Sequence, residues 1–193
     1  MRTAQITRKT KETEISLSLA LDGAGQADIR TGIGFFDHML TALAVHAGID
    51  LSVQANGDLE VDCHHTVEDT GIVLGDALAQ ALGDKSGIAR YGSALIPMDE
   101  ALAQSVLDVS GRAFLVFSAP FRGERVGSFD TCMTEEFFRA VAFHAGLTLH
   151  LQVPYGANDH HMIEAVFKAF AHSLRQAVSP LAGGQPLSTK GVL

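Results

Sequence analysis

The sequence contains no tryptophan, only two tyrosines and only two cysteines among its 193 residues. Two cysteines are too few for a disulfide framework, so we expect Cys63 and Cys132 to be reduced thiols. Basic residues are also scarce, because 14 Lys plus Arg stand against 22 Asp plus Glu, which gives a formal net charge of −8. This balance argues against nucleic acid or an anionic membrane as the main partner.

Long apolar runs are missing as well. No stretch reaches the roughly 18 consecutive apolar residues of a membrane-spanning helix, and the first residues, MRTAQI, lack the apolar core of a secretion signal. We therefore expect a cytoplasmic protein without a membrane anchor. A hydrophobic content of 47% is sufficient for a packed core.

Histidine is what the sequence has in excess: nine residues, four of them in two adjacent pairs. The motif HHxxE occurs at residues 64–68 and again at 160–164, and an apolar run that ends in His-Ala-Gly precedes each copy, at 46–48 and 144–146. A period this long is typical of duplicated half-domains rather than of a solenoid. We predict a first repeat over residues 1–85 and a second over 86–193, which ends in a tail that closes over the substrate.

The period of the apolar residues changes in the same order in both halves, from two residues to 3.6 residues and back to two. In the first half it predicts a hairpin of strands 14–21 and 26–31, a second hairpin of strands 51–53 and 59–61, and helices over 35–46 and 64–82. In the second half it predicts strands over 93–97, 101–110, 113–117 and 147–153, and helices over 134–145 and 160–178. Because helices and strands segregate, we predict the α+β class.

The HHxxE spacing has a direct chemical consequence on a helix. Residues four apart share one face, so we predict that His64 and Glu68 bind one metal ion and that His160 and Glu164 bind another. The second histidine of each motif points away and is predicted to reach the other repeat's ion. Two imidazoles and a carboxylate suit a first-row transition metal and leave space for a further ligand. The repeat offers two pairs of candidates for that ligand, either His38 and Glu136 or His46 and His144.

Some of these residues also have an ordinary structural interpretation. His46 and His144 directly precede Ala-Gly and are equally explained as packed residues near a helix end, and His172 as an exposed residue of the last helix. Lys168 follows Glu164 by four positions and is predicted to border the same pocket. Arg90, Arg112 and the run Ser188-Thr189-Lys190-Gly191 have the Ser/Gly neighbours of a phosphate site, which indicates a small phosphorylated substrate.

Four segments of the chain resemble the imidazoleglycerol-phosphate dehydratases of histidine biosynthesis. They are TGIGFFDHML at 31–40, DCHHTVEDTG at 62–71, NDHH at 158–161 and STKGVL at 188–193. The resemblance covers nearly the whole chain, and it implies central helices packed between two mainly antiparallel sheets. It also implies two Mn²⁺ per subunit, in sites between neighbouring chains of a 24-subunit homo-oligomer. The implied reaction is the dehydration of imidazole glycerol phosphate, a small phosphorylated imidazole substrate, to imidazole acetol phosphate.

The same resemblance assigns roles to individual residues. It implies that one ion is bound by His38, His64, Glu68 and His161, and the other by His65, Glu136, His160 and Glu164. It places Arg90, Arg112, Lys168, Ser188, Thr189 and Lys190 around the phosphate, and Glu12, His38 and His46 beside the substrate, with Glu12 as the candidate acid or base. The chain departs from the family pattern at Glu136, where histidine is common, and at Cys63, where aspartate is usual.

Two other classes of protein share some of these features. A dinuclear metallohydrolase acting on a small phosphorylated substrate would use the same ligands and would act on substrates without an imidazole ring. A metal-storage cage would need the ligands but not the basic residues Arg90, Arg112, Lys168 and Lys190.

Overall fold

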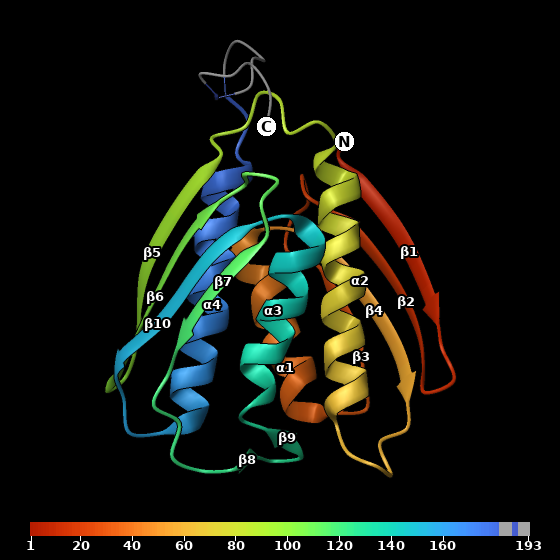
Figure 1. The fold of residues 1–193 in the computed structure, drawn as a ribbon, viewed down its shortest axis with the longest axis vertical. Helices are drawn as coiled ribbons and strands as arrows, with labels where there is room; N and C mark the ends of the chain where they lie inside the picture. Colours follow the sequence, from red (N-terminus) through yellow and green to blue (C-terminus); the bar gives the residue numbers. More distant parts are fainter. Residues whose placement is uncertain (182–186, 189–193) are drawn as a thin grey trace.

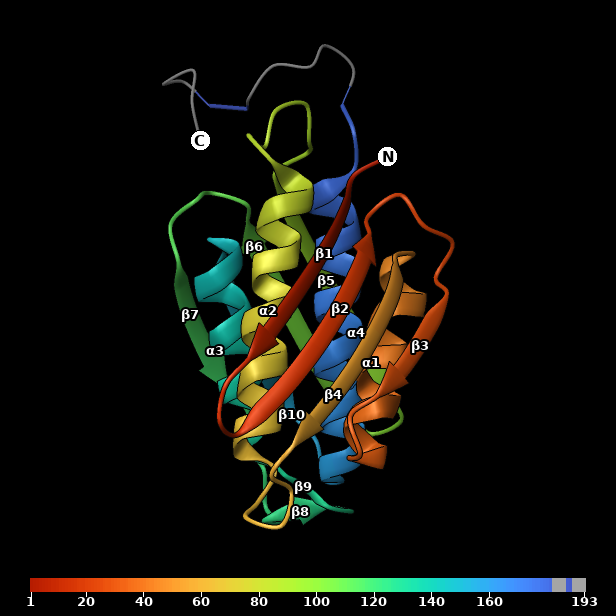
Figure 2. The same ribbon diagram turned by 90° about the vertical axis from the view of Figure 1, so that its right-hand side faces the viewer.

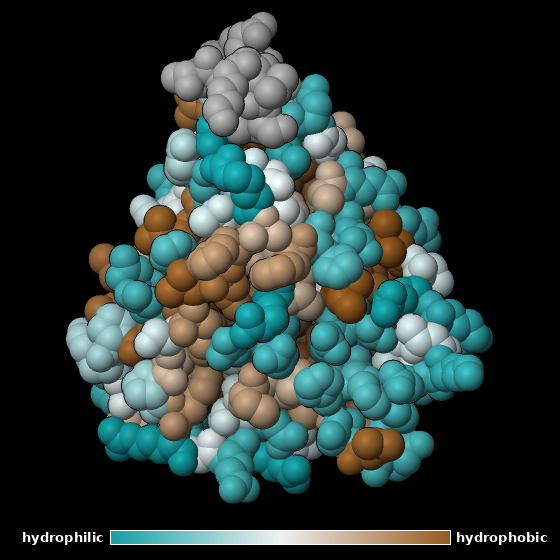
Figure 3. Space-filling model, in the orientation of Figure 1, coloured by the Kyte–Doolittle hydropathy of each residue, from teal (hydrophilic) through white to brown (hydrophobic). Residues whose placement is uncertain are grey.

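The computed structural model describes residues 1–181 and 187–188, and it consists of helices enclosed between two four-stranded sheets (Figure 1). This arrangement confirms the predicted α+β class. The face seen in Figure 3 is mostly hydrophilic, with hydrophobic residues scattered between, as expected when the core lies inside the sandwich. Within the described ranges, no helix is long and apolar enough to cross a membrane.

The elements follow one another in a similar order in the two halves of the chain. The first half contains β1 (Thr3–Lys9), β2 (Thr13–Ala20), β3 (Ala27–Arg30), α1 (Gly34–Ala47), β4 (Asp50–Gly57) and α2 (His64–Leu82). The second half contains β5 (Tyr91–Met98), β6 (Ala101–Asp108), β7 (Phe114–Ser118), β8 (Arg125–Val126), β9 (Phe129–Asp130), α3 (Met133–Ala145), β10 (Thr148–Tyr155) and α4 (Asp159–Val178).

The two main sheets have matching strand orders, β1-β2-β4-β3 and β5-β6-β10-β7. Figure 2 shows the first of them face-on. In each sheet the last strand of the order pairs in parallel and the other pairs are antiparallel. Each sheet is therefore mixed rather than purely antiparallel, whereas the division of the chain near residue 85 remains a prediction from the sequence.

Both hairpins predicted for the first half are wrong. Strand β4 pairs along the whole of β2, so β3 lies at the far edge of β4. The Asp50 carboxylate accepts hydrogen bonds from the backbone N–H groups of Ala24 and Gln26, at 2.8 and 2.9 Å, which ties the segment before β3 to the start of β4. The Asn-Gly-Asp segment ends β4 instead of joining two strands, and Leu59 follows in a turn. Strands β1, β8 and β9 have no counterpart among the elements that the sequence pattern predicts.

The helices pair across the two halves rather than within them. Helix α2 packs on α3, and α1 packs on α4. Phenylalanine rings fill the space between the helices, with the ring of Phe137 centred 5.3 Å from the rings of both Phe36 and Phe167. The core is thus continuous between the halves, which makes the chain one packed unit.

The contact between α2 and α3 depends on two glycines of α2. A Cβ atom at Gly75 would lie 2.5 Å from the Cβ of His144 and 3.0 Å from the carbonyl oxygen of Val141, and Gly71 is similarly close to Phe137. Neither α3 backbone nor Cβ atoms can move aside as a long side chain would, so glycine is required for this helix separation.

We predict that Gly75→Ala destabilises the protein by roughly 1 to 3 kcal/mol through overpacking, although alanine favours helices by up to about 1 kcal/mol. Urea unfolding followed by circular dichroism measures the change. The control is Gly34→Ala at the start of α1, where no atom lies within 4 Å of the added Cβ. Equal effects of the two substitutions would show that the contact between α2 and α3 is not the cause.

Candidate active site

All four helices begin at the end of the molecule that carries β8 and β9 (Figure 1). The histidines and glutamates that the sequence predicts as metal ligands lie within the first two turns of these helices. They are His38 on α1, His64, His65 and Glu68 on α2, Glu136 on α3, and His160, His161 and Glu164 on α4. Helix N-termini carry partial positive charge, so the carboxylates gathered here offset a field that would otherwise repel a cation.

Local hydrogen bonds fix the start of each HHxxE helix. The Asn158 side chain accepts from the backbone N–H groups of His160 and His161, which caps α4. At α2 the equivalent bond runs from the His64 N–H to the Asp62 carboxylate, at 2.7 Å. These caps determine which residues form the first turn and so aim both histidine pairs.

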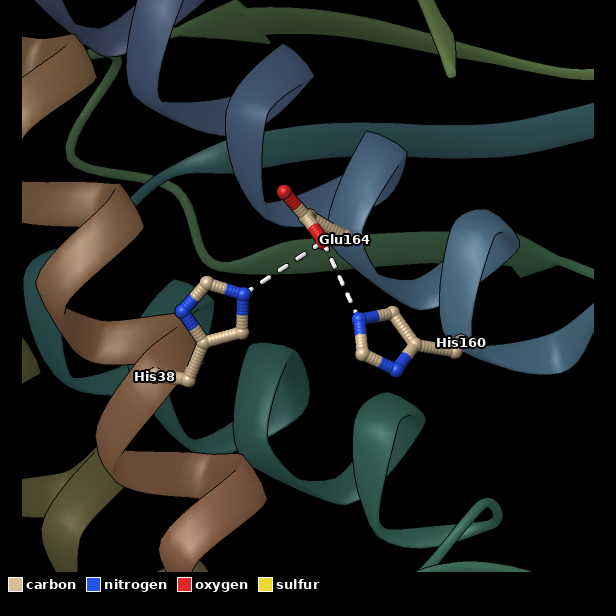
Figure 4. Close-up of side chains that lie close together, drawn as sticks. All are labelled: His38, His160 and Glu164. Carbon is tan, nitrogen blue, oxygen red and sulfur yellow. Dashed lines mark hydrogen bonds and ion pairs between the residues drawn. The ribbon is translucent and has the colours of Figure 1, made fainter. Parts of the chain in front are cut away.

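Three candidate ligands meet where α1 and α4 touch (Figure 4). The Oε2 atom of Glu164 lies 3.4 Å from Nε2 of His38 and 3.2 Å from Nε2 of His160. All three ligand atoms lie within 4.8 Å of one another, and this is the one such group of three among the described residues. The ring of Phe35 packs edge-on against His160, with 4.9 Å between ring centres, and holds its orientation.

Glu164 is buried, and a lysine compensates its charge. Burial acts to raise the pKa of the Glu164 carboxyl, but the Lys168 ammonium group, 2.6 Å from Oε1, and His38 outweigh burial and hold the pKa below its usual value. The carboxylate is therefore ionised and two imidazole nitrogens face it. This donor set fits a first-row transition metal ion.

Within one chain His38 has other neighbours than in the grouping that the resemblance implies, and that grouping remains a prediction. His38 lies with His160 and Glu164, whereas that grouping combined it with His64, Glu68 and His161. The physical reason is the helix pairing, because α1 packs on α4 and not on α2. Within one chain, the candidate ligand beside the second motif therefore comes from a helix of the opposite half.

The first HHxxE motif has the same internal geometry in a more open setting. His64 Nε2 lies 3.5 Å from Glu68 Oε2 across one helical turn, and both side chains are about half exposed. Glu136 lies in the first turn of α3, the helix that packs on α2, but its carboxylate forms an ion pair with Arg139 at 3.4 Å. The described part of the chain does not bring Glu136 into contact with His64 or Glu68.

The second histidine of each motif turns away from these groups toward a carboxylate that the sequence analysis missed. His65 Nδ1 bonds to Asp58 at 3.0 Å, and His161 Nδ1 bonds to Glu100 at 2.8 Å. The bond to Asp58 raises the pKa of His65, and the bond from His161 lowers the pKa of Glu100 to about 2. From the sequence Asp58 is predicted only as a turn residue, and no motif around Glu100 indicates a bond to a histidine.

Glu12, the candidate acid or base, stands beside the first motif. Its Oε2 atom lies 3.8 Å from Nε2 of His65, and its carbonyl oxygen accepts a hydrogen bond from the Asp58 backbone. The buried Asp69 carboxylate binds the neighbouring Thr13 hydroxyl and the Arg8 guanidinium. Asp69 follows Glu68 directly, so the loop with Glu12 is attached to the motif helix itself.

His46, His144 and His172 have polar partners rather than core positions. His46 Nδ1 and His172 Nε2 share a hydrogen bond of 3.2 Å, and burial followed by the nearby Lys168 charge lowers the pKa of His46. His144 Nδ1 bonds to Asp76 at 2.9 Å on α2. The buried Cys63 thiol contacts Asp130 at 3.6 Å, outside the group of His38, His160 and Glu164.

Arg90 and Arg112, two of the basic residues expected at the phosphate, lie at the opposite end of the molecule from the histidine motifs. The Arg90 N–H donates to the Ala177 carbonyl near the end of α4, about 25 Å from His160 at 1.5 Å per residue. Its guanidinium binds both oxygens of Asp108, at 2.7 and 3.0 Å, and the carbonyl oxygen of Leu187. Arg112 is largely exposed and lies 3.6 Å from Asp108. Ser188 follows Leu187, whereas Thr189 and Lys190 lie outside the described residues.

A family model described as imidazoleglycerol-phosphate dehydratase matches residues 31–174. A protein of that name from Lacticaseibacillus casei is 60% identical over 195 aligned residues, covering all of both chains, and one from an Exiguobacterium species is 58% identical over 99% of this chain and 98% of its own. The chain belongs to the imidazoleglycerol-phosphate dehydratase family. It is therefore an enzyme of the lyase class.

Two solved structures of imidazoleglycerol-phosphate dehydratases share this fold. The one from Staphylococcus aureus superposes with a TM-score of 0.84 at 44% identity, covering 92% of this chain and 99% of its own. The one from Pyrococcus furiosus, in complex with (S)-C348, has the same TM-score at 34% identity, covering 97% and 100%. The family fold thus includes both sheets and all four helices.

We predict that Lys168→Met destabilises the metal-free protein by roughly 2 to 4 kcal/mol, because it leaves a buried carboxylate with a weaker partner set. Chemical unfolding in EDTA measures this change. Lys9→Met is the control, because its ion pair with Glu14 is exposed and worth about 0 to 1 kcal/mol. A Lys168 variant as stable as the Lys9 variant would contradict the importance of the buried pair.

Proposed function

We propose that the protein dehydrates imidazole glycerol phosphate to imidazole acetol phosphate in histidine biosynthesis and needs two Mn²⁺ per chain to do so. The observation that supports metal dependence is the group of His38, His160 and Glu164, whose ligand atoms lie within 4.8 Å of one another. Membership of a family named for this dehydration supports the substrate. A cytoplasmic location follows as part of the proposal, because a phosphorylated metabolite cannot readily cross an apolar bilayer.

Eight side chains are the proposed metal ligands. We assign His38, His160 and Glu164 to one ion, and His64, Glu68 and Glu136 to the other, since α1 packs on α4 and α2 on α3. His65 and His161 face away from these sets, so they would serve sites shared with neighbouring chains. When bound, Mn²⁺ would supply a Lewis acid that favours deprotonation of the substrate's imidazole ring.

Glu12 is the proposed base of the reaction. The dehydration removes the hydroxyl group from the carbon attached to the ring and a proton from the next carbon, and the resulting enol tautomerises to a ketone. A base must be within reach of that proton and must not be committed elsewhere. Among the described residues the Glu12 carboxylate accepts no hydrogen bond, and 54% of its side chain is exposed. Its loop is anchored through Thr13 to Asp69, which fixes the backbone, and its carboxylate has a long ion pair with His65 Nε2 at 3.8 Å.

The distance between the histidine motifs at one end of the molecule and Arg90 and Arg112 at the other supports a site shared between chains. About 25 Å of α4 separates His160 from Ala177, which accepts the hydrogen bond from Arg90, and this is longer than the substrate, so one molecule cannot contact Arg90 and His160 of the same chain. We therefore place Arg90, Arg112, Ser188, Thr189 and Lys190 of one chain at the phosphate of a substrate whose ring lies at a neighbour's histidines. Lys168 and His46 would approach that substrate from the metal-binding chain. A homo-oligomer, as large as 24 subunits, is the proposed working form.

Removal of metal tests the proposal directly. We predict that EDTA abolishes formation of the enolisable ketone from imidazole glycerol phosphate and that Mn²⁺ restores it. Mg²⁺ should not restore activity, because it binds imidazole nitrogen poorly. Full activity in protein shown by elemental analysis to be free of metal would contradict metal dependence. Phosphate release would favour the metallohydrolase, and bound metal without turnover would favour the storage cage.

A mixing experiment tests the shared site. We predict that His160→Ala and Arg112→Ala variants are each inactive alone. They should regain activity when the two variants are dissociated, mixed and reassembled with Mn²⁺. Some sites in the mixed oligomers then combine the intact histidine end of one variant with the intact arginine end of the other. The control mixes Arg112→Ala with Lys190→Ala, whose defects are proposed to lie in the same half of the site. Absence of recovery in the first mixture, despite mixed oligomers by native mass spectrometry, would contradict a site between chains.

A further inference from the structure

His65 and His161, the second histidines of the two motifs, each form a hydrogen bond through the same ring atom, Nδ1. Nδ1 of His65 meets the two oxygens of Asp58 at 3.0 and 3.1 Å, and Nδ1 of His161 meets Glu100 Oε2 at 2.8 Å. An ionised carboxylate can only accept hydrogen bonds, so in both rings Nδ1 carries the proton. In a neutral ring, the other nitrogen then keeps its lone pair.

The nitrogens with the lone pair are available to a ligand from outside the chain's own core. Nε2 of His65 lies 3.8 Å from the Glu12 carboxylate, and Nε2 of His161 lies 3.7 Å from Asp99. Both histidine side chains are partly exposed. The two motifs therefore present the same atom, Nε2, in the same chemical state, although they lie in different halves of the chain.

We propose that Glu100 and Asp58 are positioning residues that select the tautomer of His161 and His65 in which Nε2 can bind a metal ion. This inference rests on the proposed function for the identity of the ion. Carboxylates that accept from the other nitrogen of a metal-binding histidine fix its ring and its tautomer, and their loss typically weakens metal binding about 10- to 100-fold.

The two carboxylates differ in one respect that makes the proposal testable. Glu100 Oε1 also accepts hydrogen bonds from the backbone N–H groups of Ala157 and Asn158, at 3.1 and 2.8 Å. Asp58 binds only His65 through its side chain, within the described residues. An amide at position 100 must keep its oxygen toward the two N–H groups, so its NH₂ group would face His161 Nδ1. An amide at position 58 can rotate and offer its oxygen to His65 instead.

The substitution Glu100→Gln should therefore switch His161 to the tautomer with a proton on Nε2, whereas Asp58→Asn should leave His65 unchanged. Free Mn²⁺ is measured by electron paramagnetic resonance during titration of the full-length protein at fixed pH. We expect Glu100→Gln to weaken the affinity of one Mn²⁺ site about 10- to 100-fold and Asp58→Asn to change affinity much less. The melting temperatures of the metal-free variants should match that of the wild type, because the amide preserves the backbone hydrogen bonds.

A second measurement keeps the inference separate from the identity of the metal. Solid-state ¹⁵N NMR of histidine-labelled, metal-free protein reports which ring nitrogen is protonated, and the Glu100→Gln spectrum should show one histidine exchanging its tautomer. Wild-type Mn²⁺ affinity in Glu100→Gln, an unchanged tautomer, or an equal loss in Asp58→Asn would each overturn the proposal. A wild-type protein that binds no Mn²⁺ but shows the expected tautomer switch would instead refute the proposed function and leave the role of Glu100 in place.

Discussion

The packing of α1 on α4 and of α2 on α3 determines where every candidate ligand lies. Because each pair joins a helix of one half to a helix of the other, the group of His38, His160 and Glu164 exists only when both halves are folded and docked. The aromatic rings between the helices provide the apolar contact that holds these pairs together. The site is thus formed by long-range packing. A change in the separation of the helices would move its three residues apart even if none of them were substituted.

The sequence was sufficient for the elements that local pattern controls. The helices and the HHxxE geometry follow from 3.6-residue periodicity and i,i+4 spacing, and the structure has the predicted helices at nearly the predicted bounds. It was insufficient where the outcome depends on which elements meet. The alternation in residues 26–31 indicates a strand but cannot indicate its partner, and Asp50 selects that partner from a distance of 24 residues. For the same reason the sequence could not predict that His38 lies beside Glu164, or that Asp58 and Glu100 bind the second histidines.

Charge is arranged along the long axis of the molecule. One end gathers four helix N-termini together with histidines and carboxylates, and the other holds Arg90 and Arg112 around Asp108. Each end contains charged groups of both signs, which limits repulsion between like charges within it. Under the proposed function, a substrate with both an imidazole ring and a phosphate group therefore needs the histidine end of one chain and the arginine end of another.

The ion pair of Lys168 with the buried Glu164 has a consequence for the order of events when the protein is made. A carboxylate inside a helix contact would oppose docking of α1 on α4 if its charge had to wait for an ion from solution. Lys168 lies one turn from Glu164 on the same helix, so it is beside the carboxylate as soon as that helix forms. Newly synthesised chains can therefore dock these two helices without an ion from solution to compensate the charge of Glu164.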